Sequence, residues 1–137
     1  MDNWIQEVIS KWQSEGVKLN PPATISEVDA VESFLSFKFP NDFKEFYSQA
    51  NGFNGLDWQE HMFTFWPLEM IVEEYKTNGN KNFVGFSDFL LASHFIGFNK
   101  NTPGIFKSYS EDDNGKHIAD SFEEVISMIN SSNDNIY

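Results

Sequence analysis

The amino-acid sequence predicts an α+β fold in a single domain over residues 1–137, with N-terminal helices, a central antiparallel or mixed twisted sheet and a closing C-terminal helix. Three observations support this prediction. The length of 137 residues is that of one domain. Helical hydrophobic patterns come first, short strand-like runs follow, and a last helical pattern ends the chain, which differs from alternating βαβ units. The residues are 40% hydrophobic and include 15 phenylalanines, so we expect an aromatic core.

Two amphipathic helices are expected in the N-terminal part. Within residues 2–15 the apolar side chains recur at helical spacing, and these are Trp4, Ile5, Val8, Ile9 and Trp12. Residues 1–22 are therefore expected to form a helix and a loop that ends at a pair of prolines. Thr24 and Glu27 have the spacing of a capping box, which predicts a second helix that ends near Ser36.

A third, short helix is expected after Pro40, because proline suits the first turn of a helix. The apolar residues that would form its inner face are Phe43, Phe46, Tyr47 and Ala50. Asn51 and Gly52 both tolerate a positive φ, so they can end this helix.

Short aromatic or apolar runs then indicate strands, at residues 61–66, 83–86, 90–98 and 104–109. Pro67 can start a helix between the first two of them. The run 90–98 is also compatible with a helix, because short apolar runs are ambiguous. Within it, Gly97 marks a bulge or the end of a strand.

The chain closes with a helix and a tail. Residues 111–115 read as a turn, since Asn-Gly is a strong hairpin signal. Ser121 and Glu124 again have the spacing of a helix cap, and the apolar residues that follow at helical spacing are Phe122, Val125, Ile126 and Ile129. Residues 131–137 are expected to be a frayed tail.

The charge of the chain is strongly acidic. It has 21 acidic residues against nine lysines and no arginine, for a formal net charge of −12. Such a chain is a poor candidate for binding nucleic acid and a better one for meeting a basic partner. The acidity is uneven, since residues 51–74 and 111–137 carry most of the excess and residues 75–110 are net positive. The sequence therefore predicts a bipolar surface, unless the acidity serves only solubility.

Several other classes of site find little support. The chain has no cysteine, which excludes disulfides, thiolate nucleophiles and cysteine-ligated zinc. The histidines form none of the familiar metal-binding motifs, and the acidic turn at 111–115 fails the spacing of a calcium loop, so no metal or other cofactor is expected. Paired carboxylates keep open a small carbohydrate-processing enzyme, and the candidates are Asp57, Glu60, Glu69, Glu73 and Glu74.

The location expected from the sequence is the cytoplasm. No apolar run approaches the roughly 20 residues of a membrane span. The first residues lack the basic start and apolar stretch of a signal peptide, and a chain without disulfides needs no oxidising compartment.

Several motifs together resemble the SUKH superfamily, named partly after a fungal regulator of cell-wall synthesis. The first is an amphipathic helix from Ile25 to Leu35, followed by the Phe39-Pro40 step, a short aromatic-rich helix over 42–47 and Asn51-Gly52. The Phe before the proline replaces the leucine usual in the family. Weaker motifs follow in the family's order, and these are Phe65-Trp66-Pro67-Leu68, residues 86–91 and residues 118–124. The matches span residues 25–126, most of the chain.

The resemblance implies a protein-binding function without shared catalytic residues. Many bacterial members of the superfamily look like immunity proteins that neutralise a cognate polymorphic toxin by direct binding, and others bind partners in signalling. For this chain we therefore expect a cognate toxin, basic at its contact surface, as the partner, with an intracellular scaffold as a further alternative. Charge and loop position suggest the contact residues, which are Asp57, Trp58, Glu60, Glu111, Asp112 and Asp113.

Overall fold

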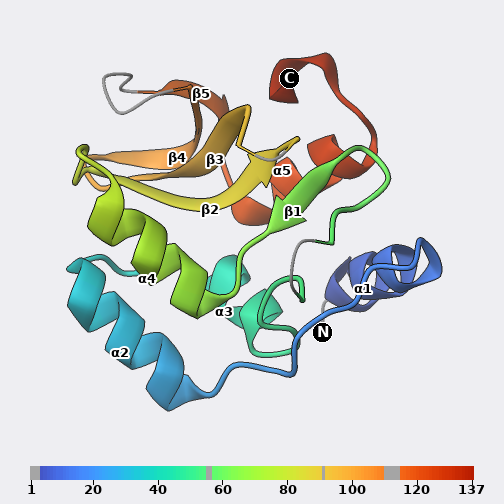
Figure 1. Cartoon of the computed structure of the whole chain (residues 1–137), viewed down its shortest axis with the longest axis horizontal. Coiled ribbons are helices and arrows are strands. Elements are labelled where there is room, and N and C mark those ends of the chain that lie inside the picture. The colour runs from blue at the N-terminus through green and yellow to red at the C-terminus, as the bar shows by residue number, and fades with distance from the viewer. Residues whose placement is uncertain (1–3, 55–56, 91, 110–114) are drawn as a thin grey trace.

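Helices and a five-stranded sheet form one α+β domain, as the sequence predicts (Figure 1). The computed structural model describes residues 4–54, 57–90, 92–109 and 115–137. Its elements, in chain order, are α1 (Trp4–Ser14), α2 (Ile25–Leu35), α3 (Asn41–Tyr47), β1 (Phe63–Phe65), α4 (Leu68–Thr77), β2 (Phe83–Phe89), β3 (His94–Asn99), β4 (Thr102–Ser108), β5 (Lys116–Ala119), α5 (Phe122–Asn130) and the 3₁₀ helix η1 (Asp134–Ile136). The strands follow one another in the order β1-β2-β3-β4-β5, and every neighbouring pair is antiparallel.

The predicted caps fix the starts of two helices. The Thr24 hydroxyl accepts a hydrogen bond from the Glu27 amide at 3.1 Å, and the Glu27 carboxylate accepts one from the Thr24 amide at 2.9 Å. This reciprocal pair satisfies two amides that would otherwise lack partners at the start of α2. The Ser121 hydroxyl likewise accepts from the Glu124 amide at 3.1 Å at the start of α5.

Aromatic side chains form the core between the helices and one face of the sheet. The Phe122 ring of α5 lies 5.0 Å from the Phe43 ring of α3 and 5.2 Å from the Phe86 ring of β2, both edge-on. Trp12 of α1 is fully buried, and its ring lies 5.0 Å from that of Phe53. Such edge-on contacts add about 0.5–1.5 kcal/mol each to the gain from burial. The expected aromatic core is thus present, and α1 is part of it.

The middle of the sheet differs from the prediction in its strand boundaries. The predicted strand 90–98 begins only at His94, and β2 continues to Phe89 instead of ending at 86. A turn separates the two strands, in which Leu90 and Ala92 have φ values of 50° and 72°. Side chains other than glycine or asparagine rarely adopt this left-handed conformation, so the turn leaves no signal in the sequence.

Two further details of the sheet were not foreseen. The segment Lys116–Ala119 forms a fifth strand, although its four residues have no strand pattern. In the pairing of β2 with β3 the irregularity in register lies between Gly85 and Ser87 and not at Gly97, which pairs directly with Gly85. A Cβ atom at Gly97 would lie 2.3 Å from the Val84 carbonyl oxygen. Gly97 is therefore a site of close backbone approach.

The predicted frayed tail is wrong, because residues 131–137 are docked. Ile136 is fully buried, and its carbonyl lies 2.8 Å from Nε2 of His94. The Lys107 ammonium donates hydrogen bonds to the carbonyl oxygens of Asn135 and Tyr137. No local pattern indicates this docking, since the partners of the tail come from β3 and β4.

Candidate functional site

The sheet has two faces that differ in what covers them. Phe86 and Phe98 point to the inner face, where their rings meet that of Phe43 in α3. Because side chains alternate along a strand, Phe83 and Phe95 point to the opposite, outer face. Helix α4 runs alongside β2 at one side of the sheet, next to α2 (Figure 1).

Trp66 is the anchor of the outer face. It follows β1, and its ring lies across Gly85, where an added Cβ atom would come within 3.1 Å of the indole. The indole Nε1 donates a hydrogen bond of 2.8 Å to the buried Asp88 carboxylate, which also accepts from the Ala92 amide at 3.2 Å. The Trp66 ring meets Phe95 edge-on at 6.0 Å. These contacts fix the indole in one orientation on the outer face.

A cleft of about 350 Å³ opens between this face and the C-terminal half of α4. This volume is at the lower end of the roughly 300–1,000 Å³ that is typical of ligand sites. Its lining consists of Trp66, Glu74, Tyr75, Thr77, Asn78, Phe83, Gly85, Phe95 and Ser108. Four of these side chains are aromatic, and Glu74 is the only charged one. A cleft with aromatic walls and one carboxylate can bury an apolar stem and pair with a positive charge.

The lysines of the net-positive segment 75–110 form hydrogen bonds and ion pairs with other residues of the chain. Lys81 donates hydrogen bonds to the Tyr75 and Lys76 carbonyls at the end of α4. Lys100 bonds the Leu35 carbonyl and, at 2.6 Å, the Tyr75 hydroxyl. Lys107 holds the tail, as described above. Lysine side chains therefore contribute less free positive surface here than the segment's net charge suggests.

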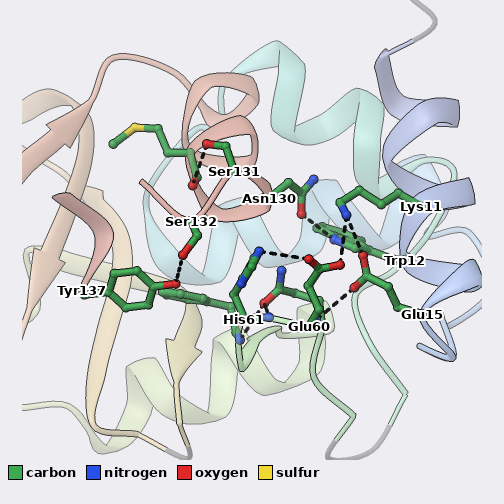
Figure 2. A network of polar contacts seen from close by, with 12 residues as sticks. Lys11, Trp12, Glu15, Glu60, His61, Asn130, Ser131, Ser132 and Tyr137 are labelled. Atoms are coloured by element: carbon green, nitrogen blue, oxygen red, sulfur yellow. Dashed lines mark hydrogen bonds and ion pairs between the residues drawn. The ribbon is translucent and has the colours of Figure 1, made fainter. Parts of the chain in front are cut away.

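The predicted contact loop at 57–60 lies beside α1, and its acids have partners within the chain. The Asp57 carboxylate accepts a hydrogen bond of 3.0 Å from the Lys18 amide. Figure 2 shows Glu60 between Lys11 and His61, with Lys11 Nζ 3.1 Å and His61 Nε2 3.2 Å from its carboxylate. These contacts reduce the charge that the two acids offer to a partner.

The same network lowers the pKa of Glu60. The contact with the Glu15 carboxyl and the hydrogen bond from Lys11 hold the pKa of Glu60 below its ordinary value. The Lys11 ammonium lies 2.9 Å from Glu15 and bridges the two acids, so its pKa is raised by both. This arrangement ties the loop to α1.

Trp58 is the exposed aromatic side chain of this loop, with 41% of its surface accessible to a partner. The other predicted contacts, Glu111, Asp112 and Asp113, lie outside the described residues. None of the residues 57–60 lines the cleft on the outer face. The cleft was missed because its residues come from five separate segments. Gly85, a glycine within a predicted strand, is the local signal that could have indicated a hollow on the sheet surface.

The histidines lie in three different surroundings. His61 meets Glu60, His94 is buried under the tail, and His117 lies 3.1 Å from Asp120. Within the described part of the chain, no group of three or more metal-ligating side chains lies together. None of the helices in that part has the length and apolar character needed to cross a membrane.

The geometry defines a class of protein, an α+β domain with a rigid aromatic core and an aromatic cleft on its outer face. The comparison with family models then places it. Residues 22–128 match the SMI1 / KNR4 family (SUKH-1), and the chain belongs to this family. Members of the SUKH superfamily include toxin-immunity proteins, and many bind partner proteins. No curated protein matches this chain.

The family match begins at residue 22, after α1. Trp12 of this helix is nevertheless buried in the core, and its Nε1 donates a hydrogen bond of 2.8 Å to Asn130 of α5 (Figure 2). Helix α1 is therefore an integral part of this domain, although it lies outside the matched region.

Proposed function

We propose that this chain is a bacterial immunity protein that binds a cognate toxin directly, without catalysis, in the cytoplasm. The observation that carries the proposal is the cleft on the outer face of the sheet, which the fold leaves free of a covering helix. A concave site walled by the partly exposed rings of Tyr75 and Phe95, with the buried Trp66 ring held at its base, is the kind of feature on which binding energy concentrates.

Family membership and charge support this role. Partner binding is common in the family, and a net charge of −12 favours association with a basic protein. Exposed acids on α4, Glu69 and Glu73, lie on the same helix as the wall of the cleft. We propose that this helix faces the partner, with Trp58 as a secondary contact.

The two alternatives receive less support. A carbohydrate-processing enzyme needs a carboxyl group whose pKa is raised, so that it can act as an acid. The pKa of Glu60 is shifted in the opposite direction. An intracellular scaffold would use the same surfaces, and only the identity of the partner separates it from an immunity protein.

The test uses the product of a toxin-like gene encoded beside this one. We expect the purified chain to bind that product and to restore growth when the two are co-expressed. Phe95→Ala, in the cleft, should weaken binding about tenfold or more, as expected of a contact near the centre of an interface. Ile25→Ala is the matched control, because Ile25 is 82% exposed on α2 and does not line the cleft.

Two outcomes would contradict the proposal. If no neighbouring product is bound or neutralised, the immunity role is wrong. If Phe95→Ala, checked to be folded, binds as tightly as the parent chain, the partner uses another surface.

A further inference from the structure

Glu74 is the one charged side chain among the described residues that line the cleft, and its carboxylate is unpaired among them. It lies on the turn of α4 that faces the sheet, and it is half-buried. Its neighbour Glu73 pairs with Lys76 at 3.3 Å, whereas the Glu74 carboxylate has neither an ion pair nor a hydrogen bond among the described residues. A carboxylate partly removed from water gains most when a cation reaches it there.

The walls of the cleft are formed largely by planar aromatic rings. The rings of Trp66, Phe83 and Phe95 all line it, and the first is held by Asp88. A planar guanidinium stacks on such rings and is more weakly hydrated than an ammonium group, so it loses less on entering the cleft. Its five donors also suit a carboxylate, which can accept two of them at once.

The nearby lysines do not occupy this position. Lys81 and Lys100 both lie over the ring of Tyr75, at 4.8 and 4.7 Å, but neither lines the cleft. Lys76 is directed toward Phe34 of α2, with its ammonium 5.6 Å from that ring. These lysines thus lie over Tyr75 and Phe34, and among the described residues none of them pairs with Glu74.

From these observations we infer that the cleft binds an arginine side chain that projects from a loop of the partner protein. The apolar stem packs against Trp66 and Phe95, and the guanidinium pairs with Glu74. This inference rests on the proposed function, to which it adds the chemistry of the inserted residue. The volume of about 350 Å³ suits one inserted side chain better than an extended peptide.

The experiment uses Nα-acetyl-arginine methylamide as the probe, added to the ¹⁵N-labelled chain and followed by NMR. We expect saturable shifts at the Trp66 indole N–H and at the Gly85 and Asn78 amides. The citrulline analogue has nearly the same shape without the charge, and should bind at least about tenfold more weakly. Glu74→Gln should weaken binding of the arginine probe by a similar factor, while the matched control Glu73→Gln should leave it unchanged.

Three results would overturn the inference. One is an equal affinity for the citrulline analogue, which would mean that charge does not matter. Another is unchanged binding to Glu74→Gln. The third is shifts confined to residues outside the cleft. Glu74→Gln removes no hydrogen bond or ion pair between the described residues, so misfolding is not expected to confuse the result.

This test is independent of the toxin. If the arginine probe binds at the cleft but no neighbouring toxin is recognised, the proposed function fails and the chemistry of the cleft stands. If a toxin is bound with equal affinity by the parent chain and by Glu74→Gln, the proposed function stands and the arginine inference fails.

Discussion

The inner and outer faces of the sheet use the same residue type for different purposes. On β2 and β3, Phe86 and Phe98 point inward and pack against α3, whereas Phe83 and Phe95 point outward and line a cleft. The difference lies in what each face is packed against, since helices cover one and only the side of α4 borders the other. An abundance of phenylalanine therefore indicates a core, but it does not show which rings are left for recognition.

The largest effect that separates the two faces is expected from Phe86→Ala. Its ring is fully buried and contacts the rings of Phe43, Phe98 and Phe122, so its removal leaves a cavity. The free energy of unfolding should fall by about 3–5 kcal/mol, measured by urea denaturation. Phe95→Ala on the outer face should cost less than half as much. Equal losses would mean that the outer face is part of the core.

The docked tail extends the inner face, and Ile136→Ala tests this. Ile136 is fully buried although it lies in the last residues described. We expect a loss near the lower end of the range of about 2–5 kcal/mol for such truncations, because the tail can adjust. Asn135→Ala is the control, since Asn135 is exposed and its backbone carbonyl, which accepts from Lys107, is retained. A loss below about 0.5 kcal/mol for Ile136→Ala would mean that the tail is frayed, as the sequence predicts.

Both paired glycines belong to the outer face of the sheet, and they differ in what an added methyl group would meet there. At Gly97 a Cβ atom would lie 2.3 Å from the backbone oxygen of Val84, which cannot move without distorting the strand. Gly97→Ala should therefore destabilise the domain by about 1–3 kcal/mol. At Gly85 the nearest atoms belong to side chains, the Trp66 ring at 3.1 Å and the Phe83 ring at 3.2 Å, so a small displacement of these rings relieves the contact without distorting the strand. Gly85→Ala should cost less stability and displace the NMR signal of the Trp66 indole.

Local signals predicted the helices of this fold better than its strands. The capping residues Thr24 and Ser121 act on amides three residues away, so the sequence alone identifies them. The turn at Leu90 and Ala92 requires a backbone conformation that these residue types do not favour, and tertiary contacts impose it. The strand β5 likewise forms because β4 offers it a partner. The family resemblance, which rests on motifs that determine the backbone conformation, is confirmed by the family match.

The candidate site was less accessible to sequence analysis. The acidic block 51–74 was identified, and Glu74 belongs to it, but which of its acids would remain unpaired depends on the three-dimensional structure. Asp57 and Glu60 form contacts with residues of the N-terminal segment far away in sequence. The rings beside Glu74 come from the segment after β1 and from β2 and β3. Spacing along one segment does not reveal such a combination.

The smallest expected effect concerns pH and the inner face at His94. Burial beneath the tail holds the pKa of His94 below its ordinary value of 6.5, and the nearby Lys107 lowers this pKa further. The hydrogen bond to the Ile136 carbonyl and the charge of the Asp88 carboxylate act in the opposite direction. The unfolded chain therefore binds a proton more readily than the folded one. Stability is complete above about pH 6.5 and falls as the pH drops toward the lower, folded value, by up to about 1.4 kcal/mol per unit of the difference.

His94→Gln isolates this contribution, because glutamine keeps an N–H donor that can reach the Ile136 carbonyl and removes the titration. Urea denaturation of both chains between about pH 7.5 and 5.5 should show a steeper loss of stability in the parent chain. His61 and His117 are present in both and cancel in the difference. Parallel curves would mean that His94 is as easily protonated in the folded state as in the unfolded one. The tail would then open readily enough to admit water, and the inner face would be closed by its helices alone.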